Sequence, residues 1–160
     1  MISVDIIAIG KLKEDYLKKG CEEYAKRLTA FCKFNIIEIS EERLPENPSE
    51  GEIKRSLEQE SSRILSAIPK KAFVISLCIE GKQMSSGELS SHIDNISLSG
   101  TGRICFVIGG SHGLSDSALS KSDMKLSFSK MTFPHQLFRL MLTEQIYRAF
   151  QISSNGKYHK

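Results

Sequence analysis

Hydrophobic residues along the chain form short apolar runs that alternate with longer segments of helical spacing. The runs are typical of strands and cover residues 2–9, 33–39, 71–79, 103–108 and 124–129. Between them, apolar residues recur every three or four positions, as in amphipathic helices. Such helices are expected at 14–31, 49–67, 85–98 and 137–152. This alternation predicts one α/β domain over residues 1–160, with a mainly parallel sheet and helices on both faces.

The run at 71–79, KAFVISLCI, is almost unbroken and lies between Pro69 and Gly81. Such a run favours a strand buried on both faces, as parallel sheets require. Ser85 and Glu88 have the spacing of a capping box, which predicts the start of the next helix.

The composition favours a cytoplasmic protein with a hydrophobic core. The chain has 160 residues, 40% of them hydrophobic, and its first apolar run is too short to span a bilayer. That run has no basic stretch before it and no cleavage pattern after it. The four cysteines contain no CxxC pair, so we expect reduced, mostly buried thiols. Neither the cysteines nor the histidines have the spacing of metal ligands, so no metal is expected.

Charge is distributed unevenly along the chain. The formal net charge is +3. Residues 38–60 hold eight acidic against three basic side chains, which is typical of a solvated face. Residues 121–160 hold two acids against seven bases: Lys121, Lys125, Lys130, Arg139, Arg148, Lys157 and Lys160. A basic stretch near a binding crevice favours an anionic partner, with RNA foremost.

Two strand ends lead into loops that suit a ligand site. The strand at 103–108 is followed by GGSHG (109–113), and the run at 124–129 is followed by KMTFPHQ (130–136). Open α/β sheets bind ligands in the crevice outside the carboxyl ends of their strands. A Rossmann site is not favoured, because the first strand-to-helix turn, GKLKED, contains one glycine.

The loop at 109–113 also matches G-x-S-x-G, the nucleophile elbow of serine hydrolases. Ser111 would be the nucleophile, with Asp116 or Asp123 and with His135 or His159. However, a short serine-rich segment follows the loop, where a nucleophile elbow needs a long helix.

Another interpretation is a cradle for a nucleoside-containing cofactor. Gly109, Gly110 and Gly113 would let the backbone approach a ligand closely. Nearby apolar residues would hold a flat base: Leu77, Phe128, Met131 and Phe133. The alternative is that these aromatic residues pack in the core. A non-catalytic nucleotide- or RNA-binding module also remains open.

Several segments resemble one known family. The block LSFSKMTFPHQLFRLMLTEQIYRAFQI, the terminal YHK, FVIGGSHG and the early AIGKLKEDY are similar to the RlmH family of SPOUT-class RNA methyltransferases. The resemblance covers essentially the whole chain. It implies a homodimer with a C-terminal trefoil knot. The implied reaction transfers the methyl group of S-adenosylmethionine to N3 of a pseudouridine in 23S ribosomal RNA of the bacterial large subunit.

The resemblance also assigns residues to the two sides of the reaction. The implied cofactor contacts are Leu77, Gly109, Phe128, Ser129, Lys130, Met131, Thr132 and Phe133. The implied substrate side contains Tyr158 and His159, which we expect to act across the dimer interface. Lys157 stands where the family pattern leads us to expect proline.

The implied chemistry suggests roles for the charged residues. His159 is a candidate base or proton relay, and Tyr158 a candidate for stacking on the base or hydrogen bonding to it. Arg148 and Lys130 would supply positive charge. The alternative for Arg148 is a simple pair with Glu144, four residues earlier. The last helix is apolar around nearly its whole circumference, which independently favours burial against a second subunit.

Overall fold

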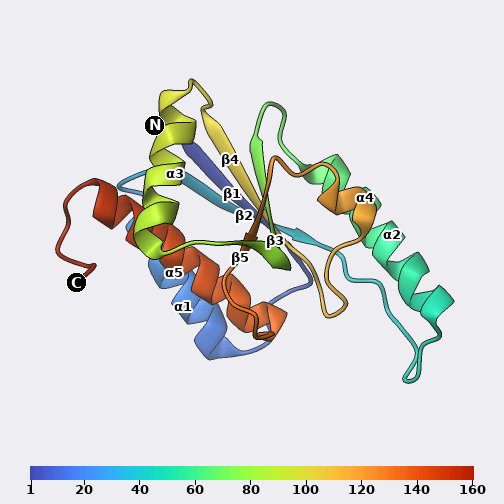
Figure 1. Cartoon of the computed structure of the whole chain (residues 1–160). Helices are drawn as coiled ribbons and strands as arrows, with labels where there is room; N and C mark the ends of the chain where they lie inside the picture. The colour runs from blue at the N-terminus through green and yellow to red at the C-terminus, as the bar shows by residue number, and fades with distance from the viewer.

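The structure is a computed structural model that describes residues 1–160, with helices and strands alternating along the chain (Figure 1). The elements are β1 (Ser3–Ile9), α1 (Asp15–Leu28), β2 (Lys33–Ile39), α2 (Glu50–Ala67), β3 (Phe73–Gln83), α3 (Ser86–Leu98), β4 (Arg103–Ile108), α4 (Asp116–Leu119), β5 (Met124–Ser127) and α5 (His135–Ser153). The predicted α/β class is confirmed. The trefoil knot stays a prediction.

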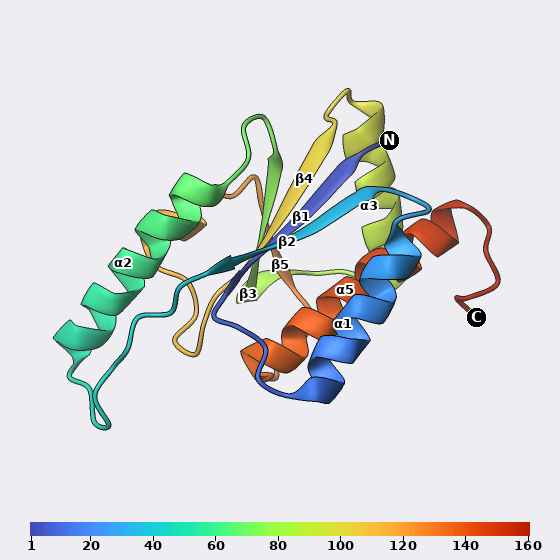
Figure 2. The same ribbon diagram turned by 180° about the vertical axis from the view of Figure 1, so that it is seen from behind.

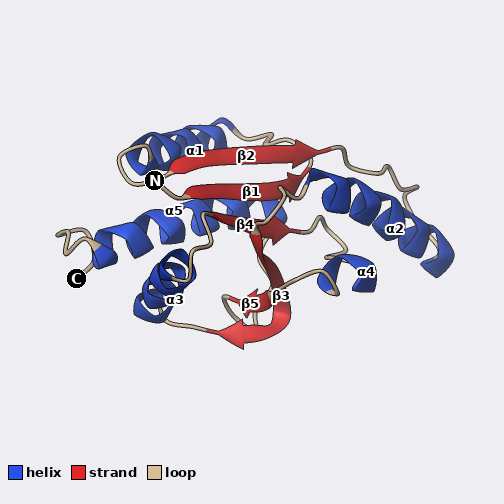
Figure 3. Cartoon of the chain, turned by 90° about the horizontal axis from the view of Figure 1, so that it is seen from above, coloured by secondary structure: helices blue, strands red, loops and turns tan.

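The five strands form one sheet in the order β2-β1-β4-β3-β5, and every neighbouring pair is parallel. Helices α1, α3 and α5 cover one face, while α2 and α4 cover the other (Figure 3). The two central strands, β1 and β4, are therefore buried on both sides. Because all strands run the same way, the loops that follow them gather at one edge of the sheet.

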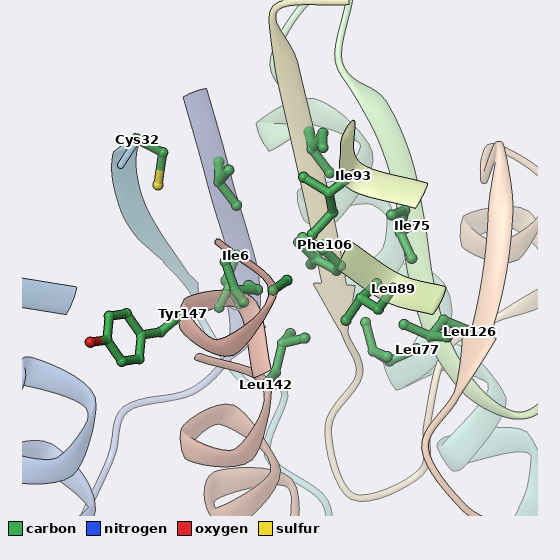
Figure 4. Close-up of a cluster of buried hydrophobic side chains, with 14 of the residues drawn as sticks. Ile6, Cys32, Ile75, Leu77, Leu89, Ile93, Phe106, Leu126, Leu142 and Tyr147 are labelled. Atoms are coloured by element: carbon green, nitrogen blue, oxygen red, sulfur yellow. The ribbon is translucent and has the colours of Figure 1, made fainter. Parts of the chain in front are cut away.

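Successive residues of the central strands enter two separate cores. Ile6 and Phe106 belong to the larger core, beneath α1, α3 and α5, together with Leu142 and Ile146 of α5 (Figure 4). The adjacent residue, Ile7, belongs to the smaller core on the opposite face. This alternation explains why these strands are apolar along most of their length.

Strand β3 is longer than the sequence analysis expected. Its apolar run ends before Gly81, but the strand continues to Gln83, with an irregularity in its pairing with β5 between Leu77 and Lys82. A Cβ on Gly81 would lie 2.7 Å from the backbone of Leu126 in β5. Gly81 thus permits close strand approach and does not end the strand, so the expected boundary was wrong.

Helix capping follows the sequence closely. The predicted capping box of Ser85 and Glu88 is present at the start of α3. An equivalent box, Ser49 and Glu52, begins α2. Each box satisfies backbone N–H groups that have no partner within their helix.

The structure also shows the state of the cysteines, the grouping of metal-ligand residues and the apolar character of the helices. All four cysteines are free; Cys78 is half-buried and the other three are buried. No group of three or more His, Cys, Asp or Glu side chains is placed to hold a metal ion. None of the helices combines the length and the apolar character needed to cross a membrane.

Arg139 of α5 is buried, with 2% of its surface exposed, and fastens the helix to the sheet. Its Nη1 donates to Glu38 Oε2 at 2.7 Å, and its Nη2 donates to the carbonyl oxygen of Gly10 at 3.0 Å. These bonds join α5 to the carboxyl ends of β1 and β2. Arg139, one of the seven bases of residues 121–160, is therefore not available to bind an anionic partner at the surface.

We expect Arg139→Ala to lower the free energy of unfolding by about 3 kcal/mol, because it leaves a void and removes donors from buried carbonyl groups. The matched control is Arg27→Ala, which breaks an exposed pair with Glu23 and should destabilise the protein far less. Urea denaturation at one fixed protein concentration measures both changes. Equal losses in the two variants would contradict the role given to Arg139.

Candidate active site

A cavity of about 830 Å³ lies at the carboxyl edge of the sheet. Its walls come from three separate stretches: the second half of β3, the loop after β4, and the turn between β5 and α5. The ranges that line it are 77–80, 108–114, 126–129 and 131–135, with Leu119 and Phe138. The crevice expected from the strand ends is therefore present.

The structure brings most of the expected cofactor contacts to this cavity. Those that line it are Leu77, Gly109, Phe128, Ser129, Met131, Thr132 and Phe133. Lys130 lies in the same turn and is exposed, but it does not line the cavity. Residues separated by more than 50 positions in the sequence thus meet at one site.

Two glycines give the loop after β4 its shape. A Cβ on Gly109 would clash with the carbonyl group of Gly113. Gly113 has a φ of +78°, a backbone conformation that favours glycine, and its N–H donates to Gly110 O at 3.0 Å. The loop therefore folds tightly and exposes backbone to the cavity.

The turn between β5 and α5 supplies the apolar wall. The ring of Phe128 lies 4.7 Å from the ring of Phe138, centroid to centroid, and Phe128 also packs against the larger core. Met131 is different, because 74% of its surface is exposed. Core packing thus accounts in part for Phe128 and does not account for Met131.

Sequence reasoning missed several residues of the cavity wall, including Ile79, Cys78 and Phe138, and it placed His135 only in a hydrolase triad. Burial lowers the pKa of His135 and favours the neutral imidazole. Burial, and then the charge of Glu80, raise the pKa of the Cys78 thiol. The position of Cys78 at the end of a predicted buried strand, next to Leu77, was the available signal.

The expected substrate-side residues meet in a second place. Arg148 Nη2 donates to Glu144 Oε1 at 2.5 Å, so the pair given above as the alternative for Arg148 is present. The Tyr158 hydroxyl donates to the same oxygen at 3.0 Å, and Arg148 Nη1 lies 3.1 Å from His159 Nδ1. None of Arg148, Tyr158 and His159 lines the cavity of their own chain. The tail follows the end of α5 that is remote from the cavity loops (Figure 2).

A smaller hollow of about 430 Å³ lies beside this polar cluster, among α1, α3 and α5. Tyr24 and Glu144 line one part of it, and apolar side chains of α5, including Leu140 and Met141, line another. Its wall shares Leu126 and Phe128 with the larger cavity. The two sites are thus neighbours.

The structure does not support the hydrolase interpretation. Ser111 makes no hydrogen bond to a histidine, and Asp123 accepts one from the backbone N–H of Val74 at 2.8 Å. The helix after the loop, α4, has four residues. A nucleophile elbow requires a base in contact with the serine and a long following helix.

Comparisons with known proteins define the class of the fold and site. A family model described as a predicted SPOUT methyltransferase matches residues 2–159. A solved structure of a probable methylase family protein from Haemophilus influenzae Rd KW20 superposes with a TM-score of 0.53. The match covers 99% of this chain and 70% of that chain at 14% identity, so it shows a likeness of fold alone.

Sequence relatives narrow the class further. Ribosomal RNA large subunit methyltransferase H from Clostridium botulinum (strain Eklund 17B / Type B) is 52% identical over 159 residues, covering 99% of this chain and all of that protein. The protein of the same name from Bacillus pumilus (strain SAFR-032) is also 52% identical, with the same coverage. The chain therefore belongs to the SPOUT methyltransferase family and, within it, to the RlmH family that its sequence resembles.

We expect Cys78 to be the one thiol that reacts with maleimide in the folded protein, because the other three cysteines are buried. Its raised pKa keeps the thiolate scarce at neutral pH, so the rate should rise about tenfold per pH unit between pH 7 and pH 9. Intact mass spectrometry should show one adduct, absent in Cys78→Ala. Two or more rapid adducts on the folded protein would contradict this assignment.

Proposed function

We propose that this methyltransferase transfers the methyl group of S-adenosylmethionine to N3 of a pseudouridine in the 23S ribosomal RNA of the bacterial large subunit. The relatives at about 50% identity are named ribosomal RNA large subunit methyltransferases, which supports that substrate class. The observation that carries the proposal is the meeting of the three cavity stretches around one hollow. A cytoplasmic location is part of the same proposal, since ribosomal RNA is the substrate.

The residues of the cavity fit the proposed cofactor. Its volume of about 830 Å³ lies within the range of small-ligand sites, roughly 300–1,000 Å³. The backbone of the Gly109–Gly113 loop would hydrogen-bond the polar parts of the nucleoside, and Phe128 and Met131 would enclose its base. When bound, S-adenosylmethionine supplies a methyl group already activated by a sulfonium centre. The protein then has to hold the acceptor nitrogen in line with that methyl group.

We infer that the substrate side is completed by a second copy of the chain. Arg148, Tyr158 and His159 lie away from their own cavity, although the proposed reaction needs them beside it. Helix α5 also keeps half-buried apolar side chains, Leu140 and Met141, on the wall of the smaller hollow. A homodimer that covers this wall would bring the tail of one subunit toward the cavity of the other.

The acceptor determines what the tail residues must do. During transfer the carbon–sulfur bond breaks, a carbon–nitrogen bond forms at N3, and the imide proton leaves to water. Positive charge from Arg148 stabilises the electron-rich imide. Burial, and then hydrogen bonds with Tyr24 and Glu144, raise the pKa of Tyr158. Tyr158 therefore stays a neutral phenol that can stack on the base or hydrogen-bond to it, and it is not a phenolate base.

Calorimetry with S-adenosylmethionine tests the cofactor proposal. We expect Gly109→Ala to weaken binding at least about tenfold, because the new Cβ forces the cradle open. Gly102→Ala is the matched control before the same strand, where a Cβ meets no atom within 4 Å, and it should bind normally. Saturating cofactor should also slow the maleimide reaction of Cys78. Failure of the wild-type protein to bind would overturn the proposal.

Mass spectrometry of ribosomal RNA nucleosides tests the substrate proposal. We expect a strain that lacks this gene to lose one N3-methylated pseudouridine and to regain it when the gene is restored. The Gly109→Ala gene should not restore it, whereas the Gly102→Ala gene should. Unchanged nucleosides in the deleted strain would refute the assignment. Cofactor and RNA binding without methylation would favour a non-catalytic binding module.

A further inference from the structure

Glu144 lies at the centre of the polar cluster that carries the chain's tail. Its Oε1 accepts hydrogen bonds from the Tyr158 hydroxyl at 3.0 Å, from Arg148 Nε at 3.0 Å and from Arg148 Nη2 at 2.5 Å. Its Oε2 accepts from Gln145 Nε2 at 3.0 Å. Four donors thus hold one carboxylate. A carboxylate held in this way fixes the orientation of the groups that donate to it.

Hydrogen bonds from α3 and α1 also hold the cluster. Gln145 Oε1 accepts a hydrogen bond from Ser86 Oγ, in the first turn of α3, at 2.7 Å. The Tyr24 hydroxyl of α1 lies 3.1 Å from that of Tyr158. Since the Tyr158 proton is directed at Glu144, Tyr24 is the donor in this pair. Three helices therefore converge on Glu144.

The orientation of Arg148 determines the protonation pattern of His159. Arg148 Nη1 lies 3.1 Å from His159 Nδ1, and a guanidinium group can only donate hydrogen bonds. His159 Nδ1 must therefore accept, which leaves the proton of the neutral ring on Nε2. The exposed side of the imidazole then offers an N–H group and no free lone pair.

We propose that Glu144 is a positioning residue that, through Arg148, holds His159 as a hydrogen-bond donor toward the substrate. This proposal rests on the proposed function and assigns His159 a role different from that of a base. His159 Nε2–H would donate to a carbonyl oxygen next to N3 of the pseudouridine. That bond stabilises the imide anion and lowers the pKa of the imide, so the proton leaves to water while the nitrogen lone pair attacks the methyl carbon.

Two substitutions of His159 separate a donor from a base. The amide of His159→Gln can accept from Arg148 through Oε1 and donate through Nε2, but it cannot take up a proton. We therefore expect His159→Gln to keep kcat within about fivefold of wild type, whereas His159→Ala should lose about fiftyfold or more. Single-turnover methylation of large-subunit RNA or particles, with all subunits loaded with cofactor, provides the measurement. If His159→Gln is as slow as His159→Ala, the donor role is wrong.

The role of Glu144 has a spectroscopic readout that simple packing would not change. Long-range nitrogen-15 spectra of labelled histidine should show the Nε2–H form of His159 in the wild-type protein. In Glu144→Gln they should show a mixture of both tautomers. The same variant should lose about tenfold in kcat with its affinity for S-adenosylmethionine within about twofold.

Glu23→Gln provides the matched control, because Glu23 forms the other Glu–Arg pair of this spacing, with Arg27 on α1. It should leave the His159 tautomer and kcat unchanged. A Glu144→Gln protein with wild-type tautomer and rate would overturn the proposal, as would an Nδ1–H form in the wild type. A wild-type protein that shows the Nε2–H form but methylates no RNA would instead refute the proposed function.

Discussion

Parallel pairing of the strands is the constraint on which the site depends. Strands β4, β3 and β5 are adjacent in the sheet and run in one direction, so their carboxyl ends reach the same edge. The loops that follow these strands come from distant parts of the sequence, yet all of them begin at this edge. Arg139 completes the arrangement, because it fastens the first turns of α5 to the same ends of β1 and β2. The cavity thus lies where the carboxyl ends of these neighbouring strands meet.

Two glycines shape this edge of the sheet because they have no side chain. Gly81 allows β3 to approach the backbone of β5, and Gly109 allows the loop after β4 to fold against itself. At both positions another stretch of backbone lies so close that a Cβ would clash with it. A cavity shaped by backbone suits a nucleoside, whose many donors and acceptors match N–H and C=O groups.

Much of this structure could be predicted from the order of apolar and polar residues. The strands and helices could be located because the short apolar runs of strands differ clearly from the three-to-four-residue spacing of helices. The capping box at Ser85 located the start of one helix. Gly81 was misjudged because a glycine after an apolar run usually marks a turn, and only its contact with β5 reveals its place inside a strand. Arg139 entered the sequence analysis only as one of seven bases, although an arginine within a helix that is apolar all round already indicates a buried cation. The hydrogen bonds of Glu144 depend on three helices and have no counterpart in local sequence.

Helix α5 contributes residues both to the cofactor cavity and to the polar cluster around Glu144, and it holds the two at a fixed separation. His135, its first residue, lines the cofactor cavity, whereas Glu144 and Arg148 lie further along the same helix. At 1.5 Å per residue, nine residues separate His135 from Glu144 by roughly 14 Å along the axis, which is beyond the reach of a side chain. A rigid helix cannot shorten that distance. The hydrogen bonds that order Tyr158 and His159 therefore hold the tail beside Glu144 and away from the cofactor end of the helix, and the second subunit that would bring a tail to that end stays a prediction.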